Sequence, residues 1–427
     1  MPSRFSILGA SLLPLVIACG GKGDADQIAP PTESPAGDAG SDAASQSSTE
    51  GGAQGSGFAA LDAYLDARMA GGLHGYALQI YGADGKLAHQ REAGTCATTP
   101  ACPKGNPAFT ADLVTGIASS SKWVTSTTVL AVLDDLVAQG KAPSIDAALD
   151  TKVAPILACP GVTGPVTDIT MRHLLSFTSG VIAGHPCVSD RDGTLQSCAC
   201  DILRDSAKAM TTSTEQSTAR QGAHAPGTTF KYGESHHAVA GAVVEKITGT
   251  AWSSVFQAKI QTPLGTKMTY KSVKNLAGSM EASVSDYAKF VRGIQQDALG
   301  NKVLLSKVAV EAQRASQIPA GAARLIGPQP GFDYGLNNWR WCYSTFDEAT
   351  LLGDLTKLSI DNSCSQVFQT GHGGKGGYQP FIDAQGRYFA VFASREESAG
   401  AGDQYNNEEL ALTMRVRLLT HLAMVPR

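Results

Sequence analysis

The chain has 427 residues, of which 43% are hydrophobic, enough for one large globular unit or two ordinary domains. Its formal net charge is −4, so it has no basic excess with which to neutralise a run of phosphates or to bind an anionic membrane surface. A nucleic-acid partner is therefore not expected.

The first 19 residues have the pattern of an export signal. Arg4 precedes an apolar stretch that ends at Ala18-Cys19, and this stretch is too short to cross a bilayer of about 30 Å. The segment Val16-Ile-Ala-Cys19 resembles the lipobox of bacterial lipoproteins, which implies a signal peptide over residues 1–18 and an acylated Cys19. We expect an extracytoplasmic protein that is lipid-anchored to a bacterial membrane, in the periplasm or at the cell surface. An ordinary cleaved signal with an incidental Cys19 is the alternative.

A low-complexity segment follows the signal. Residues 19–57 consist mostly of Gly, Ala, Asp, Ser and Pro, and Ile28 is the one large apolar residue in the segment. Such a composition cannot bury enough surface to offset the entropy of ordering, which predicts a disordered linker. The folded domain is expected over residues 58–427.

Eight cysteines remain when Cys19 is set aside. An even number in an exported protein favours disulfides, and Cys96 with Cys102 and Cys342 with Cys364 are plausible local pairs. The pairing of the other four stays open; these are Cys159, Cys187, Cys198 and Cys200. The cluster of His185 with the cysteines around it has zinc-like ligands, but disulfides are favoured in this compartment.

Patterns typical of strands lie near both ends of the folded region. After a short helical stretch at residues 61–69, residues 76–81 and those from Lys86 onward predict a β-hairpin around Asp84-Gly85. Residues 377–384 and 387–395 predict a second hairpin, followed by a helical stripe over 408–422. A sheet built from both chain ends is therefore expected.

Helical patterns dominate the region between the hairpins. The clearest apolar stripe covers residues 129–137, another spans 238–248 before Gly249, and a third follows the capping pattern Ser283-Val-Ser-Asp286. Strands at the ends and helices between them predict an α+β fold with a mostly helical insertion. The cleft between the two parts is the expected site.

The segment Ser119-Ser-Ser-Lys122 is an S-x-x-K motif at the start of the strongest predicted helix. Residues three apart on a helix face the same way, so the Ser119 hydroxyl and the Lys122 amine can meet. A serine hydroxyl needs a neighbouring base to act as a nucleophile, and a helix N-terminus favours developing negative charge. On its own, however, this short motif also fits a solvated helix cap.

Two further motifs follow in order, at Tyr232-Gly-Glu234 and at His372-Gly-Gly-Lys375. With S-x-x-K they resemble the three motifs of the serine β-lactamase and penicillin-binding-protein family, which includes class C β-lactamases, D-alanyl-D-alanine carboxypeptidases and related esterases. Further matches lie at residues 169–180 and 278–290. The resemblance covers about residues 61–422 and implies the β-lactamase/transpeptidase-like fold, an antiparallel sheet flanked by helices.

The resemblance also implies roles for individual residues. Ser119 would be the nucleophile, Lys122 its proton acceptor and Tyr232 the partner that moves protons to and from the leaving group. The oxyanion would lie between the backbone N–H groups of Ser119 and Lys375, the residue after Gly374 on the edge strand. His372, in place of the more frequent lysine, would hold a substrate carboxylate or the proton network.

Glu234 departs from the family pattern, which has asparagine there. An asparagine amide donates a hydrogen bond to the substrate's acylamino carbonyl, and an ionised carboxylate cannot. Efficient β-lactam hydrolysis is therefore in doubt; Ser235 could replace the contact, or the substrate class could differ. Other polar residues nearby are interpreted as helix caps or packing residues: Ser176, Ser179, His173, His236 and His237.

The sequence thus predicts a serine hydrolase that uses no metal or cofactor and forms an acyl-enzyme on Ser119. Its substrate would be a small molecule, a peptide or an ester, with a cell-wall peptide or a β-lactam among the candidates. A catalytically silent cell-surface binding protein that kept the fold is the alternative, and Glu234 is the best hint for it.

Overall fold

A computed structural model gives the structure of the chain. It describes residues 57–96, 101–190, 192–212, 222–326, 331–345, 347–353, 355, 359–361, 363–395 and 407–425. The predicted signal, Cys19 and nearly all of the predicted linker lie outside these residues. Within the described part no helix is both long and apolar enough to cross a membrane.

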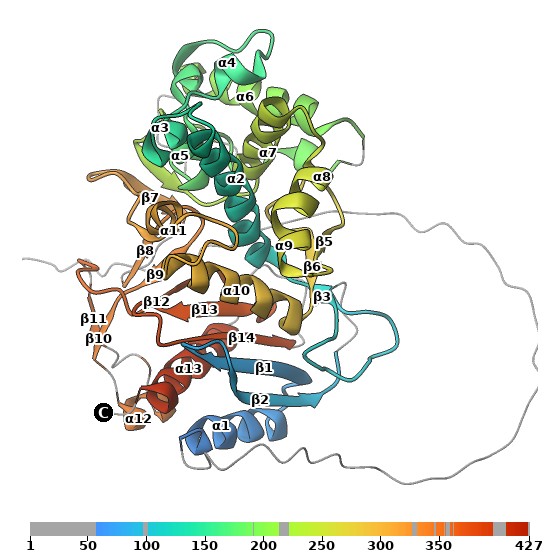
Figure 1. Cartoon of the computed structure of the whole chain (residues 1–427), viewed down its shortest axis with the longest axis vertical. Helices are drawn as coiled ribbons and strands as arrows, with labels where there is room; N and C mark the ends of the chain where they lie inside the picture. Colours follow the sequence, from blue (N-terminus) through green and yellow to red (C-terminus); the bar gives the residue numbers. More distant parts are fainter. Residues whose placement is uncertain are drawn as a thin grey trace, which may run out of the picture.

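The main sheet joins the two ends of the described chain (Figure 1). The described residues form seven strands in the order β2-β1-β14-β13-β12-β9-β8, and every neighbouring pair is antiparallel. Their bounds are β1 Gly75–Gly82, β2 Leu87–Gly94, β8 Phe332–Tyr334, β9 Trp339–Trp341, β12 Gln369–Gly371, β13 Gln379–Asp383 and β14 Tyr388–Arg395. β1 pairs with β14 over its whole length, from Gly75↔Arg395 to Gly82↔Tyr388. Both predicted hairpins are confirmed, and they are joined by the pairing of β1 with β14, the second and third strands in this order.

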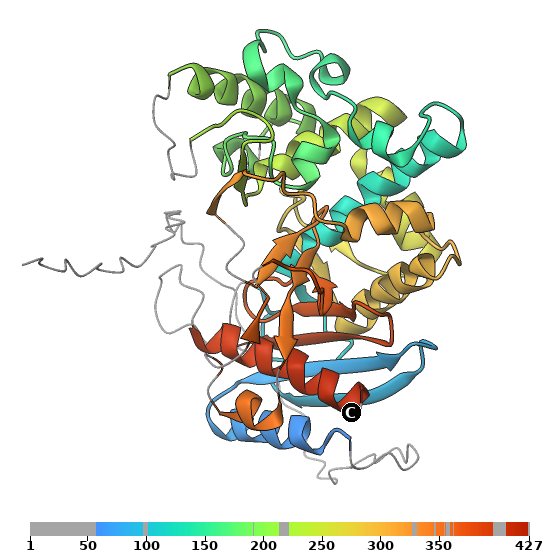
Figure 2. The same ribbon diagram turned by 90° about the vertical axis from the view of Figure 1, so that its left-hand side faces the viewer.

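The alternation of side chains along the strands explains why both faces of the sheet are covered. In β1, Tyr76, Leu78 and Ile80 enter one apolar cluster, and Ala77 enters the other. The first cluster packs against α1 (Ala59–Ala70) and α13 (Asn407–Met424), which lie together on one face of the sheet (Figures 1 and 2). The second packs against α10 (Val284–Ala298) on the other face. This produces two hydrophobic layers with the sheet between them.

The helical part stands above the sheet in Figure 1 and is centred on α2 (Ser121–Ala138). The first 14 residues of α2 are buried, and the helix contacts α3 and α7. The other described helices are α3 Ile145–Leu149, α4 Ala154–Leu157, α5 Met171–Leu175, α6 Leu195–Thr212, α7 Ser235–Thr248, α8 Trp252–Phe256, α9 Thr262–Leu264, α11 Lys307–Arg314 and α12 Glu348–Leu352. The predicted α+β fold with a mostly helical insertion is confirmed.

The other strands of the described residues form three small sheets outside the main one. They are β3 Thr115–Gly116, β4 Thr229–Lys231, β5 Thr269–Tyr270, β6 Met280–Ala282, β7 Ala323–Ile326, β10 Tyr343–Thr345 and β11 Ser359–Ile360. β3 pairs with β6, and β3 leads directly into the turn before α2. The predicted helix boundaries hold at two places: the Ser283 hydroxyl accepts from the Asp286 N–H at the start of α10, and Gly249 ends α7 in the left-handed region.

All eight cysteines outside the N-terminal segment are paired. Cys96–Cys102 and Cys342–Cys364 are the expected local bridges, and the four central cysteines form Cys159–Cys200 and Cys187–Cys198. The cysteines of the zinc-like cluster are therefore used in disulfides, as the disulfide interpretation predicted.

Candidate active site

Ser119 lies in a tight turn immediately before α2. The turn is a single 3-10 segment, Ala118–Ser120, and its first residue has a left-handed φ of +44°. A non-glycine residue in this region stores strain, which the packing around it must hold. The Ser119 side chain is half-buried, whereas Ser120 and Ser121 are fully buried. The turn therefore singles out Ser119 from its two serine neighbours.

Lys122 lies one helical turn further along and is almost completely buried, with 2% of its surface exposed. Its Nζ donates to Ser119 Oγ at 3.1 Å and to the Ala277 carbonyl at 2.9 Å. The same Nζ is 4.7 Å from the centre of the Tyr232 ring. The structure thus brings together the serine and lysine of the first motif in the geometry that their spacing predicts.

Tyr232 follows β4 and is half-buried in an aromatic group at the site. Its ring stacks on those of His372 and Trp339, with centroid distances of 5.9 Å in both cases, and packs against Phe177 at 4.8 Å. Trp339 comes from β9, a strand that the sequence reasoning did not place. Residues from four distant parts of the chain therefore line one wall beside Lys122.

The side chain of His372 is fully buried below this wall. Its Nδ1 lies 3.0 Å from the Gly373 carbonyl, and its Nε2 lies 3.0 Å from the Tyr334 hydroxyl. A carbonyl only accepts, so Nδ1 carries the proton of a neutral ring. Burial, together with the positive charge of Lys122, holds the pKa of His372 well below its usual value of 6.5. A neutral, enclosed imidazole fits the proton network better than a direct contact with a substrate carboxylate.

The hairpin between β12 and β13 packs directly on the turn that carries Ser119. The Ser120 hydroxyl contacts the carbonyls of His372 at 2.9 Å and Tyr378 at 3.1 Å, so it binds both sides of the hairpin turn to the Ser119 segment. Gly374 approaches the turn so closely that a Cβ there would lie 2.1 Å from the Ile117 carbonyl oxygen. This position therefore requires glycine.

The expectation that Lys375 lies on an edge strand is wrong. β12 is an interior strand between β13 and β9, and its pairing ends at Gly371. Lys375 is exposed in the turn beyond the strand, where Gly374 and Tyr378 close the hairpin. The aromatic strands β8 and β9 extend the sheet past β12, and the short motif gave no sign of this addition.

Glu234 occupies the position before the first residue of α7. Its backbone N–H donates to the Ala183 carbonyl at 2.7 Å, and its side chain is half-buried without capping the helix. Ser235, which could have replaced the missing amide, is fully buried, and its hydroxyl accepts from the His185 N–H at 2.9 Å. Ser235 therefore has a structural role.

Two neighbouring histidines of α7 are buried behind the wall. His236 contacts the Ser179 hydroxyl at 2.9 Å, and both histidines pack on the Phe177 ring. Burial lowers the pKa of His236 to about 3 and that of His237 well below 6.5, with the charge of Lys122 acting in the same direction. Both are buried and pack beside the site, and the sequence did not show that they surround it.

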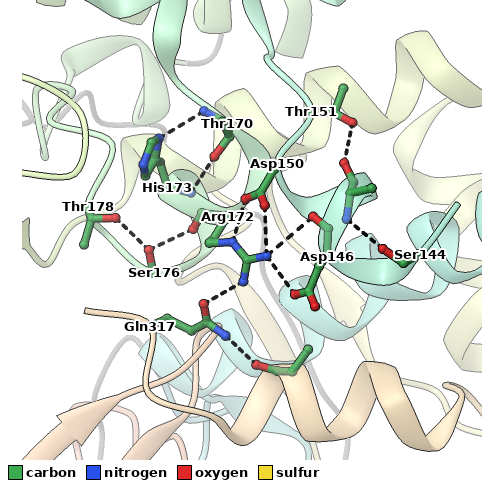
Figure 3. A network of polar contacts seen from close by, with 12 residues as sticks. Ser144, Asp146, Asp150, Thr151, Thr170, Arg172, His173, Ser176, Thr178 and Gln317 are labelled. Carbon is green, nitrogen blue, oxygen red and sulfur yellow. Dashed lines mark hydrogen bonds and ion pairs between the residues drawn. The ribbon is translucent and has the colours of Figure 1, made fainter. Parts of the chain in front are cut away.

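A polar network anchors the segment that carries Phe177 (Figure 3). Arg172 contacts Asp146, Asp150 and Gln317 at 2.7 to 2.9 Å, which ties α5 to α3 and to the segment after α11. At the start of α5 Thr170 and His173 form a reciprocal capping box. Phe177 itself has a φ of +58°, a strained conformation that this network helps to hold.

Among the described residues no group of three or more histidine, cysteine or acidic side chains is arranged to hold a metal ion. The chemistry of the site is that of a hydroxyl, an amine and a phenol beside a glycine-rich hairpin. Together with a sheet drawn from both chain ends and a buried helix that begins at the serine, these features define the serine-hydrolase fold of β-lactamases and penicillin-binding proteins.

The comparison with protein families agrees with this class. The Beta-lactamase family matches residues 61–414, and the chain therefore belongs to the β-lactamase family. No curated protein sequence gives a significant match.

Three solved structures illustrate the likeness. A candidate β-lactamase from Bacteroides dorei has a TM-score of 0.61 at 22% identity, over 85% of this chain and 99% of that chain. EstCE1, a hydrolase with promiscuous acyltransferase activity, has a TM-score of 0.55 at 16% identity, over 84% of this chain and 97% of the other. A D-stereospecific amidohydrolase from Streptomyces sp. has a TM-score of 0.53 at 19% identity, over 86% and 98%. At these identities the likeness shows the fold alone.

Proposed function

We propose that the protein is a serine hydrolase that cleaves an ester or amide through an acyl-enzyme on Ser119. The observation that carries this proposal is the 3.1 Å contact between the buried Lys122 amine and the half-buried Ser119 hydroxyl. A nucleophile and a base within hydrogen-bonding distance are the signature of covalent catalysis. Lys122 accepts the Ser119 proton in its neutral form, so the reaction begins from a deprotonated amine.

In the first half of the reaction Ser119 Oγ attacks the substrate carbonyl and its proton passes to Lys122. The negative oxygen of the tetrahedral intermediate is stabilised by the N–H groups of Ser119 and Lys375. The intermediate collapses when the bond to the leaving group breaks, and Tyr232 passes to that group the proton that Lys122 took from Ser119. In the second half water attacks the acyl-enzyme, loses a proton to the same pair of bases and releases the acid, and Ser119 regains its proton.

Small esters fit this site better than β-lactams. Glu234 cannot offer the amide donor that the family's asparagine offers, and the Ser235 side chain is fully buried, away from a bound substrate. Relatives of the same fold include EstCE1, a hydrolase with acyltransferase activity, and a D-stereospecific amidohydrolase. We therefore propose esterase activity first, with D-amino peptides as the next substrates to test.

The test is to label the purified protein with a fluorescent fluorophosphonate and to map the modified residue by mass spectrometry. Ser119→Ala and Lys122→Ala should each lower the turnover of p-nitrophenyl acetate by at least about 10³-fold. Ser176→Ala is the matched control, because that hydroxyl only contacts the Arg172 carbonyl and Thr178. Unchanged turnover in Ser119→Ala, or labelling at another serine, would contradict the mechanism. A complete lack of turnover and labelling would favour the silent binding protein.

We further propose that the protein works outside the cytoplasm on a lipid anchor at Cys19. The four disulfides of the described residues support an oxidising compartment, since such bonds are rare in the cytosol. In cells fed a radiolabelled fatty acid, the wild-type protein should carry label and fractionate with membranes, and Cys19→Ala should do neither. Label in Cys19→Ala would contradict this anchor.

A further inference from the structure

Two charged side chains outside the three motifs hold the turn that carries Lys375. Glu409 Oε1, from α13, accepts hydrogen bonds from the N–H groups of Gly376 and Gly377, both at 2.8 Å. Arg395, the last residue of β14, donates from Nη1 to the Gly376 carbonyl at 2.8 Å. Gly376 is therefore held through its N–H by the carboxylate and through its carbonyl by the guanidinium.

The other terminal nitrogen of the Arg395 guanidinium contacts β3, the strand that precedes Ser119. Arg395 Nη2 donates to the Gly116 carbonyl at 2.6 Å, and Gly116 lies three residues before Ser119. One planar group thus joins the backbone segments that supply the two proposed oxyanion donors, one ending at Ser119 and the other turning at Lys375. The fixed fork of an arginine sets the spacing between the two carbonyls that it contacts.

The turn needs such support because of its composition. Gly376 and Gly377 have φ values of +86° and +90°, and glycine is the residue with the largest conformational freedom in the unfolded or loosened chain. At Gly377 any side chain would be strained by the φ of +90°, and its Cβ would also displace Ser394 Oγ, which would lie 2.0 Å away. Rigidity must therefore come from side chains around the turn.

The burial of Arg395 indicates that the contact has more than a folding role. Its side chain is 2% exposed, and its acceptors are neutral carbonyls. Burying a guanidinium is costly: the nearby Glu409 carboxylate acts to raise the pKa of Arg395, but desolvation outweighs it and lowers that pKa to about 10. Proteins tolerate such costs most often at functional sites, where donors must be held in place before the reaction begins.

We propose that Arg395 and Glu409 are positioning residues of the active site, which fix the Gly374–Gly377 turn against the Ser119 segment and so keep the Lys375 N–H directed at the oxyanion. This inference rests on the proposed hydrolase function. It predicts that the pair acts on the tetrahedral intermediate, and hence on the rate of acylation, and has little effect on ground-state binding of substrate.

The test compares variants of the full mature chain in single-turnover acylation by p-nitrophenyl acetate. Glu409→Ala and Arg395→Ala should each lower the acylation rate about 10- to 1000-fold and change KM less than about 3-fold. Glu409→Gln keeps an acceptor oxygen and should retain most of the rate. Arg395→Lys can reach only one of the two carbonyls and should be intermediate. Arg387→Ala is the matched control, because Arg387 lies in the turn at the other end of β14 from Arg395 and pairs with Asp383.

A second measurement is independent of activity. Hydrogen exchange followed by mass spectrometry should show faster exchange in the peptide that contains Gly376 and Gly377 in Glu409→Ala, and no such change in Arg387→Ala. If Arg395→Ala does not fold, Glu409→Ala and Arg395→Lys decide the question.

Wild-type acylation rates in Glu409→Ala and Arg395→Lys, or an equal loss in Arg387→Ala, would overturn the positioning role while leaving the hydrolase proposal intact. If the wild-type protein itself is neither acylated nor labelled at Ser119, the proposed function fails, and the exchange data alone then report on the turn.

Discussion

The close approach of Gly374 to the nucleophile turn gives a quantitative test of the site. In Gly374→Ala the new Cβ would lie 2.1 Å from the Ile117 carbonyl oxygen and 3.1 Å from the Ser120 nitrogen, where ordinary contact begins at 3.4 Å. The hairpin must therefore move away by about 1 Å, and a misplacement of this size can reduce a rate about 10²-fold. Loss of the oxyanion contact that moves with it predicts a fall of about 10²–10³-fold in kcat/KM, or about 3–4 kcal/mol.

The assay is the hydrolysis of p-nitrophenyl acetate, with a thermal melt of each variant to show that it is folded. Gly116→Ala is the matched control, because a Cβ there would meet Ala101 at 3.5 Å, an ordinary contact, in the strand that enters the same turn. A Gly374→Ala enzyme within about 3-fold of wild type would refute the reasoning, since such a change is far smaller than one lost oxyanion donor. So would an equal loss in Gly116→Ala.

Three other predictions concern charge. The folded-state pKa values of His236, His237 and His372 lie below 6.5, so their contribution to stability is complete above pH 6.5 and is lost as the pH falls below it. The free energy of unfolding, measured in urea, should therefore fall by up to about 4 kcal/mol per pH unit, about 1.4 kcal/mol for each histidine, and should fall less steeply in His236→Gln. Asp134 is buried, which raises its pKa, but hydrogen bonds from Lys302 and Ser306 outweigh burial and lower it below 3.8. Asp134→Asn should therefore lower the free energy of unfolding by about 1–3 kcal/mol at neutral pH, and the difference from wild type should shrink as the pH falls through that lowered pKa. An unchanged melting temperature at pH 7 would contradict this. Glu234→Asn should raise kcat/KM for nitrocefin more than for p-nitrophenyl acetate, and equal changes on both would mean that Glu234 does not set the substrate class.

The elements of the fold could be predicted where local pattern and tertiary burial agree. The strands β1 and β14 are almost continuously apolar because each contacts a hydrophobic layer on both faces of the sheet. The start of α10 is indicated by its cap at Ser283. The position of β12 was not predictable in this way. Its neighbour β9 lies some 30 residues earlier in the chain, and the pairing of two three-residue strands leaves no period to recognise.

The site residues likewise differ in whether their contacts are local or long-range in the sequence. Ser119 and Lys122 are three residues apart on one helix, so their contact follows from helical geometry alone. The approach of Tyr232 and His372 depends on folding over more than 100 residues and was inferred only from the resemblance to a family. Trp339, Ser120, Arg395 and Glu409 carried no local signal, because their roles arise from contacts between segments that are distant in sequence.

The pairing of β1 with β14 also has a consequence for how the chain matures. The two strands are joined along their whole length, yet more than 300 residues separate them, so β1 keeps one unpaired edge until the last part of the chain is available. Contacts of such long range slow folding, and an open apolar strand can pair with other chains. The hairpin that packs on the Ser119 turn lies next to β14 in the sheet. A chain emerging from its N-terminus would therefore lack a complete candidate site, and would be prone to aggregate, until nearly all of it had been made, which makes a holding chaperone most useful at that stage.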